Sequence, residues 1–253
     1  MNVTYYRLEL RRLRRDYTTM FFTAGLPAFL YIIFGASPEY GDEPIRDGNV
    51  AMWIMIAMAG YGAVTATTGI GGMAAVERMQ GWGRQLGLTP LTDGGYVRVK
   101  AATSLTIAAI PICLVYALGA FTGAKAPLSV WVTSALMLMV GATTFALYGL
   151  SFGMAFRSEA AVSAAGGSLV ILSFLGNIFV PVSGWQLTLA KFTPLYGYVS
   201  LARRPLTGGT TIDTSTDELI PIALWQPVLN VVVWTTVFAV LSVWLVQRGR
   251  VRQ

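Results

Sequence analysis

The side chains that most often carry out enzyme chemistry are scarce in this sequence, and those present lack the spacing that catalysis needs. The 253 residues contain no histidine, which excludes histidine metal ligands and histidine acid–base catalysis. Cys113 is the only cysteine, so an internal disulfide and a cysteine-rich metal site are both excluded. It lies in an apolar run and is expected to pack as a small hydrophobic side chain.

The sequence also lacks the motifs of phosphate chemistry. A Walker phosphate loop requires Gly-x-x-x-x-Gly-Lys-Ser/Thr, whose amides and lysine hold the phosphates, and this pattern does not occur. Gly69, Gly71 and Gly72 lie in an apolar stretch without a lysine and are expected to let helices approach closely. Because carboxylate pairs, a serine nucleophile elbow and metal-ligand spacings are missing too, we expect a chain without catalytic residues.

The composition indicates a chain surrounded by lipid. Hydrophobic residues make up 55% of the sequence and charged residues only 12%, with a mean hydropathy of +0.60, whereas soluble domains carry about 25% charged residues. Six long windows contain no charged residue, and each is long enough to cross a hydrocarbon core of about 30 Å as a helix of about 20 residues. The expected fold is an all-α membrane protein, a single transmembrane domain with six transmembrane helices at about 17–35, 50–72, 97–121, 129–152, 160–180 and 222–247.

The positions of Lys and Arg predict the orientation of these helices. Five of the 18 basic residues fall on one side of the predicted membrane, and the other thirteen fall on the side of both chain ends. Basic residues are enriched in cytoplasmic loops, so both termini are expected to be cytoplasmic. The net charge of +6 is then mainly a topology signal, and nucleic-acid binding is the poorer explanation.

Residues 2–16 have the pattern of an amphipathic helix. Val3, Tyr6, Leu10, Leu13 and Tyr17 recur at helical spacing, and arginines fill the remaining faces. Such a helix is expected to lie in the inner headgroup layer, with its basic face toward anionic lipid. The alternative is a basic flank that only sets the topology.

The cytoplasmic connection at 74–92 combines a helical apolar face with charged residues. Gly87 can end a short helix there, and Trp and Arg are enriched at binding hot spots. The segment is therefore a candidate docking surface, and the alternative is a connector that only anchors at the headgroups. The residues that we expect to contribute are Glu77, Arg78, Gly81, Trp82, Arg84, Leu86, Thr89 and Pro90.

The apolar segment 181–206 is interrupted by three prolines and two glycines. It is expected to enter the outer leaflet as short re-entrant helices, since irregular backbone at membrane depth needs protein or water to cover it. Trp185, Tyr196 and Tyr198 would anchor it at the outer interface.

Polar residues within the predicted spans are few and uncharged. The candidates to line a substrate path are Asn177, Asn230, Thr65 and Thr68, and the alternative is that they only hydrogen-bond between helices. The absence of an ionisable group in the windows disfavours proton- or sodium-coupled transport. Gly149 and Gly153 fit a small-residue motif of helix dimers.

Two stretches resemble the permease subunit of the ABC transporter type-two family, which includes exporters of the drug and antibiotic-resistance kind. The resemblance covers essentially the whole chain, with one departure at Trp82-Gly83. The first motif is Glu77-Arg78…Gly81…Leu86…Thr89-Pro90-Leu91, and the second is Pro181…Trp185…Phe192-Thr193-Pro194-Leu195…Arg203…Leu206-Thr207-Gly208.

The resemblance implies a role for each unusual segment. The N-terminal helix would be a connecting helix, the segment 74–92 a coupling helix seated in a separate ATPase subunit, and 181–206 the re-entrant helices. ATP and Mg would be held by that ATPase, present in two copies, and this chain would bind no cofactor. A second permease chain, identical or a sister, would complete a transporter in a bacterial plasma membrane.

The function expected on these grounds is the membrane subunit of an ATP-driven exporter of amphipathic or hydrophobic substrates. One alternative is an ATP-independent membrane protein, such as a channel or an immunity factor. An intramembrane enzyme ranks last, because the spans offer no acid or base for proton transfer.

Overall fold

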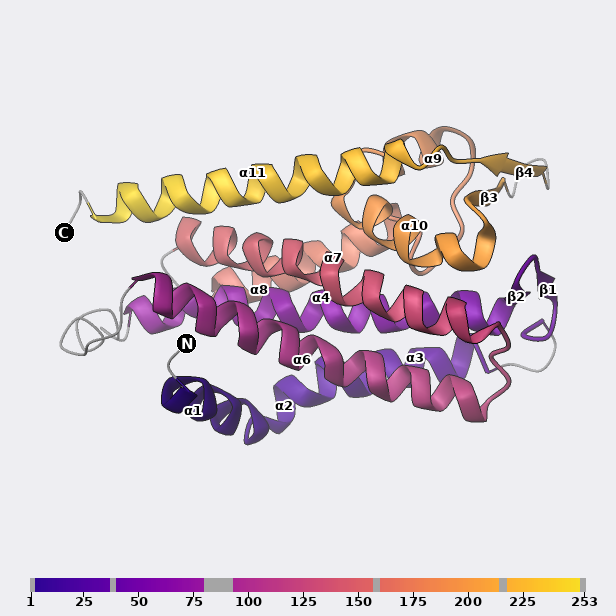
Figure 1. Ribbon diagram of the computed structural model, residues 1–253. Helices are drawn as coiled ribbons and strands as arrows, with labels where there is room; N and C mark the ends of the chain where they lie inside the picture. The colour runs from indigo at the N-terminus through magenta and orange to yellow at the C-terminus, as the bar shows by residue number, and fades with distance from the viewer. Residues whose placement is uncertain (1–2, 37–39, 80–92, 157–159, 214–217, 251–253) are drawn as a thin grey trace.

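A computed structural model describes residues 3–36, 40–79, 93–156, 160–213 and 218–250. The long helices run side by side in an elongated bundle, and two short hairpins lie together at one end (Figure 1). The opposite end carries the N-terminal helix α1 (Val3–Arg14) and the C-terminal end of α11 (Trp225–Arg250).

Among the described residues, five helices are long and apolar enough to cross a membrane. They are Tyr17–Phe34, Val50–Met73, Ala102–Phe121, Leu128–Ala155 and Trp225–Leu245. The first is built from α2 (Tyr17–Met20), a π-helical turn η1 (Phe21–Gly25) and α3 (Leu26–Phe34), while the others lie within α4 (Val50–Met79), α6 (Asp93–Phe121), α7 (Leu128–Ala155) and α11. The predicted all-α membrane architecture is therefore confirmed at this level.

The remaining predicted span, 160–180, is shorter in the structure. Helix α8 covers Ala160–Leu175, only 16 residues, which is about 24 Å at 1.5 Å per residue. It ends where Gly176 packs against Leu195 and Asn177 adopts a left-handed conformation with φ of 65°. The helix thus stops five residues before the predicted boundary.

Helix α4 is the centre of the bundle. It packs against α3, α6, α7, α8 and α10 (Pro194–Thr207), and most of its apolar window is buried. Because its neighbours cover it on several sides, α4 is buried while α11 and the outer faces of α6 and α7 remain available to lipid. Small residues make this possible: a Cβ at Gly71 would overlap the Ala146 carbonyl oxygen, and a Cβ at Gly149 would overlap that of Thr68.

The close contact that Gly149 and Gly153 make is with α4 of the same chain. A Cβ at Gly153 would lie 3.0 Å from the carbonyl oxygen of Gly72. The small-residue motif predicted from sequence therefore packs α7 against α4, and its match to a dimer face reflects the same requirement for close helix approach.

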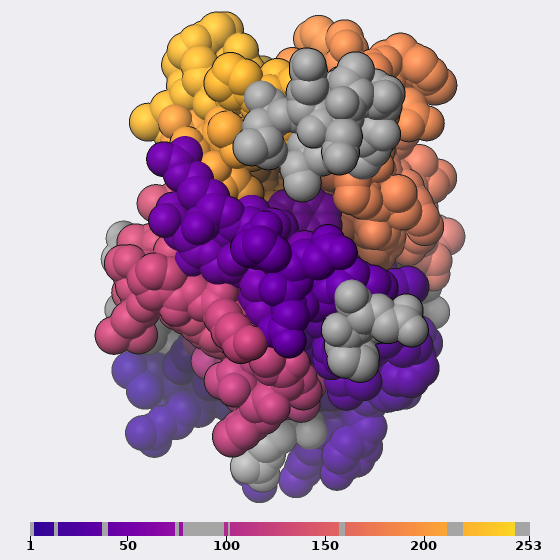
Figure 2. Space-filling view, turned by 90° about the vertical axis from the view of Figure 1, so that its right-hand side faces the viewer, coloured from indigo at the N-terminus to yellow at the C-terminus, as the bar shows by residue number. Residues whose placement is uncertain are grey.

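Two antiparallel hairpins form the end opposite the termini. One pairs β1 (Pro44–Ile45) with β2 (Gly48–Asn49), and the other pairs β3 (Thr210–Asp213) with β4 (Glu218–Pro221). Figure 2 looks onto this end, where the violet residues of β1–β2 lie between the pink α6–α7 connection and the orange segment with α10 and β3. These strands were not expected from the sequence.

Asn49 holds this end of the bundle together. Its Oδ1 accepts hydrogen bonds from the amides of Met52 (3.1 Å) and Lys125 (2.9 Å), and its Nδ2 donates to the Gly123 carbonyl (2.8 Å). The same side chain therefore caps the first turn of α4 and fixes the α6–α7 connection beside it.

Candidate functional site

The end of the bundle with the chain termini contains a cluster of charges with two buried carboxylates, which we call the ion-pair cluster: Glu9, Arg12, Glu77 and Lys100. The Lys100 Nζ atom lies 2.5 Å from Glu77 Oε1 and 3.0 Å from Glu9 Oε1. Arg12 Nη1 lies 3.4 Å from the same Glu77 oxygen. The side chains of Glu77 and Glu9 are 5% and 9% exposed, so these carboxylates are largely shielded from solvent.

Three separate elements supply the ion-pair cluster. Glu9 and Arg12 belong to α1, Glu77 lies in the last turn of α4, and Lys100 lies near the start of α6. The C-terminal end of α4 and the N-terminal end of α6 flank the connection 80–92. The ion-pair cluster therefore ties the N-terminal helix to both ends of the segment that the sequence marks as a docking surface.

Further contacts seat α1 on the bundle beside these charges. The Tyr6 hydroxyl lies 2.6 Å from Thr106 Oγ1 on α6, and Leu10 packs with the small apolar cluster around Ile70 and Ile107. Tyr5 is buried, and this burial, followed by the charge of Glu9, raises the pKa of its phenol above the ordinary value. A phenol that stays protonated can donate to a carboxylate.

Glu77 differs from its predicted role in one respect. It was expected to offer polar contacts to a docking partner, yet it is only 4% exposed and bonded within its own chain. Helix α4 continues through 74–79, the first six residues of the predicted coupling segment, without a break. Gly81, Trp82, Arg84, Leu86, Thr89 and Pro90 lie outside the described residues, as does the side chain of Arg78.

The polar residues proposed to line a path hold helices together where their contacts are described. The Thr68 hydroxyl donates to the Phe145 carbonyl of α7 at 3.3 Å. Asn230 on α11 donates to the carbonyls of Lys191 (2.7 Å) and Thr193 (3.1 Å) before α10. These bonds favour the helix-packing alternative for both residues, while Thr65 lies half-buried on α4.

The segment 181–206 forms two helices, α9 (Gly184–Ala190) and α10, separated by a turn at 191–193. Thr193 caps α10 with its hydroxyl, and Pro194 occupies the first turn. Trp185 is 72% exposed, as an interfacial anchor would be. Tyr196 and Tyr198 are each 2% exposed, so the prediction that they reach the interface is wrong. Both pack inside the bundle, where the Tyr198 hydroxyl donates to the Leu138 carbonyl at 3.1 Å.

Arg203 is one of two arginines in α10, and the sequence marked it only as part of a motif. It is 4% exposed, and its guanidinium carbon lies 3.4 Å from the ring centroid of Trp53 on α4. Its Nη1 donates to the Asn177 carbonyl at 2.6 Å and its Nε to the Trp53 carbonyl at 3.4 Å. Arg203 therefore joins α4, α10 and the turn after α8 at the hairpin end.

Long apolar helices in one bundle, with charged residues held at its ends, are the arrangement of a multi-pass membrane protein. No protein-family model matches the chain. Over 241 residues it is 22% identical to a protein of Bacillus subtilis (strain 168) named "Putative transport permease YvfS", and the similar region covers 92% of each chain. The similarity therefore spans almost all of both proteins.

Proposed function

We propose that this chain is the membrane-spanning subunit of an ATP-driven ABC exporter and that a separate ATPase docks on the segment 74–92. The observation that carries the proposal is the ion-pair cluster, which joins α1, α4 and α6 around that segment. Similarity to a transport permease over 92% of the chain adds support.

In this proposal, ATP binding brings two ATPase subunits together and displaces the docked segments. The Glu77–Lys100 pair makes the adjoining ends of α4 and α6 move as one body. A 30-residue helix is about 45 Å long, so α4 would carry a displacement from the docking end to Asn49 and Trp53 at the hairpin end. The substrate would be an amphipathic or hydrophobic molecule moved out of the cell.

Buried ion pairs fix the relative arrangement of helices more than they stabilise the folded chain. Removing charges from water costs about as much as their attraction returns, but breaking such a pair leaves a charge unsatisfied. The three elements are therefore held in one relative arrangement, and a partner that moves one of them must move the others.

The proposal is tested by purification of the affinity-tagged full chain from membranes of its own host in a mild detergent. An ABC ATPase should co-purify in a one-to-one ratio with the chain and hydrolyse ATP. Recovery of the chain without an ATPase, at full yield and in folded form, would favour the ATP-independent alternative. The untagged strain supplies the background.

A further inference from the structure

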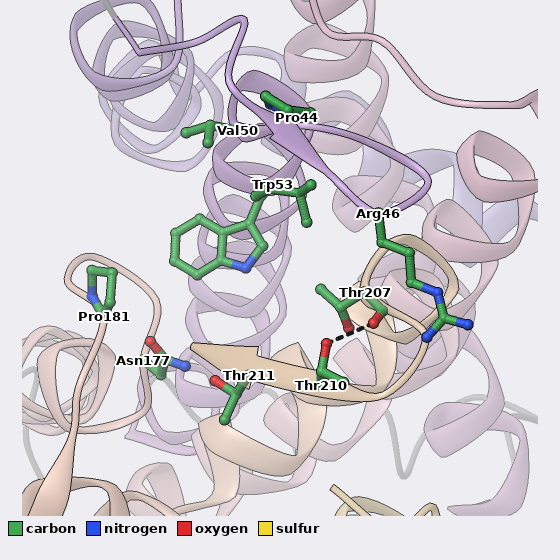
Figure 3. A pocket seen from close by; sticks show the side chains of 10 residues that line it. Pro44, Arg46, Val50, Trp53, Asn177, Pro181, Thr207, Thr210 and Thr211 are labelled. Carbon is green, nitrogen blue, oxygen red and sulfur yellow. Dashed lines mark hydrogen bonds between the residues drawn. The ribbon is translucent and has the colours of Figure 1, made fainter. Parts of the chain in front are cut away.

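A cavity of about 410 Å³ opens at the hairpin end, between the β1–β2 hairpin, α4, the turn after α8 and β3. Its size is typical of sites for small organic ligands. In Figure 3 the indole of Trp53 projects into this space, with Asn177 and Pro181 on one side and Thr211 on another. Ile45 and Val50 add apolar surface, so most of the lining is apolar.

A smaller polar recess continues from this cavity. Arg203 and Arg204 line only the recess, while five residues line both spaces: Trp53, Asn177, Thr207, Thr210 and Thr211. A molecule bound in the larger cavity would therefore place its apolar body against Trp53 and direct a polar group toward the guanidinium groups.

The recess contains polar atoms that lack partners. Arg203 Nη2 and Asn177 Oδ1 are both buried, and neither has a hydrogen-bond partner in the described part of the chain. Asn177 is 7% exposed and Arg203 4% exposed. Buried polar groups in native proteins are normally satisfied, so these two atoms are available to a polar group of a ligand.

The charge of the site is positive. Among the described residues that line the cavity or the recess, Arg46, Arg203 and Arg204 are basic and none is acidic. No described acidic side chain forms an ion pair with Arg203. A buried guanidinium without a counter-ion is costly, and an anionic ligand would supply one.

From this arrangement we infer that the cavity binds a small amphipathic anion, with its apolar part on Trp53 and its anionic group on Arg203. Asn177 Oδ1 additionally accepts a hydrogen bond from a hydroxyl or amide of the ligand. This site is independent of the proposed ATPase, because its residues lie at the end of the bundle opposite the ion-pair cluster.

The test compares two fluorescent probes that differ in one charged group: anilinonaphthalene sulfonate and the uncharged phenylnaphthylamine. Each is titrated into the purified chain in nanodiscs of zwitterionic lipid, with empty nanodiscs as background. The sulfonate should bind saturably and more tightly than the neutral probe by about tenfold or more, since a hydrogen bond to a charged group discriminates by at least that factor. Equal affinities, or no saturable binding above background, would overturn the inference.

Three variants locate the site. Asn177→Asp places a carboxylate beside Arg203 and keeps a residue type that tolerates a left-handed conformation; it should weaken sulfonate binding by about tenfold while the neutral probe changes less than about twofold. Val50→Phe should weaken both probes by filling the cavity, whereas Val132→Phe, at a 50% exposed position on α7, should weaken neither. If the preference for the anion survives Asn177→Asp in folded protein, the assignment to Arg203 is wrong.

Discussion

Lys100 neutralises two buried carboxylates at once, and this makes it the most sensitive residue of the ion-pair cluster. Replacement by Met leaves Glu9 and Glu77 buried without the cation that both carboxylates contact. Breaking a buried pair in this way costs about 3–5 kcal/mol. We expect Lys100→Met to lower the melting temperature of the detergent-solubilised chain markedly.

The matched control is Lys125, which pairs with Asp42 at 2.7 Å but with both side chains about 70% exposed. Solvent screens such pairs, so Lys125→Met should leave the melting temperature nearly unchanged. An equal decrease of the melting temperature in the two variants would show that burial of the ion-pair cluster contributes nothing to the stability of the chain.

Asp16 caps the helix that begins the first apolar segment. The side chain and then the backbone amide of Thr19 donate to its carboxylate and hold its pKa below the usual value. Asp16→Ala should cost about 1 kcal/mol at neutral pH, and Asp16→Asn less. Because the folded-state pKa is lowered, this stabilisation is present above the unfolded value and disappears as the pH falls through the folded value. Melting curves at pH 7 and pH 3 check this, and a loss that is equal at both would contradict it.

At the scale of elements, the contact between α4 and α7 depends on one glycine face. A Cβ at Gly71 would overlap the Ala146 carbonyl oxygen and lie 2.7 Å from the Leu150 amide nitrogen, whereas a Cβ at Gly69 meets nothing within 4 Å. Gly71→Ala should therefore destabilise the chain by about 1–3 kcal/mol through overpacking.

Gly69→Ala is the control from the same helix, and it should be neutral or slightly stabilising because alanine favours helices. Thermal unfolding of the two purified variants distinguishes them. If Gly69→Ala were the more damaging change, the described packing of α4 against α7 would be incorrect.

The sequence predicted the elements well where charges delimit apolar windows, as at Tyr17–Phe34 and Leu128–Ala155. The early end of α8 had a local signal in Gly176-Asn177, since both residues are common after helix ends. The continuation of α4 through Glu77 had no local signal in the sequence. An apolar window shows how much of a helix lies in lipid, but the helix can continue beyond it.

The contacts that build the candidate sites could not be predicted from the sequence. Lys100 meets Glu9 across 91 residues, and Arg203 meets the Trp53 carbonyl across 150. Such pairs depend on how the helices pack, which the spacing of charged and aromatic residues along the chain does not reveal. For the same reason Tyr196 and Tyr198 were assigned to the surface although they pack in the core.

For the whole molecule, the number of crossings decides where the chain ends lie. The five long candidate helices alone would place the termini on opposite sides, whereas a crossing by the shorter α8 places them on the same side. We expect six crossings and two cytoplasmic termini, in accord with the distribution of basic residues.

Single cysteines in a Cys113→Ala background test this expectation with a membrane-impermeant maleimide. Lys125→Cys should react in intact cells, while Arg7→Cys and Arg252→Cys should react only after permeabilisation. Labelling of position 252 from outside would mean that α8 does not cross.

The central claim is that a separate ATPase docks on the segment 74–92, and photo-crosslinking in living cells tests it most directly. Benzoylphenylalanine is placed either at Trp82, within that segment, or at Trp185, which is 72% exposed and lies in α9 near the hairpin end. We predict an adduct with an ABC ATPase subunit from position 82 and none from position 185. No ATPase adduct from position 82, in a variant that inserts at wild-type levels, would contradict the account.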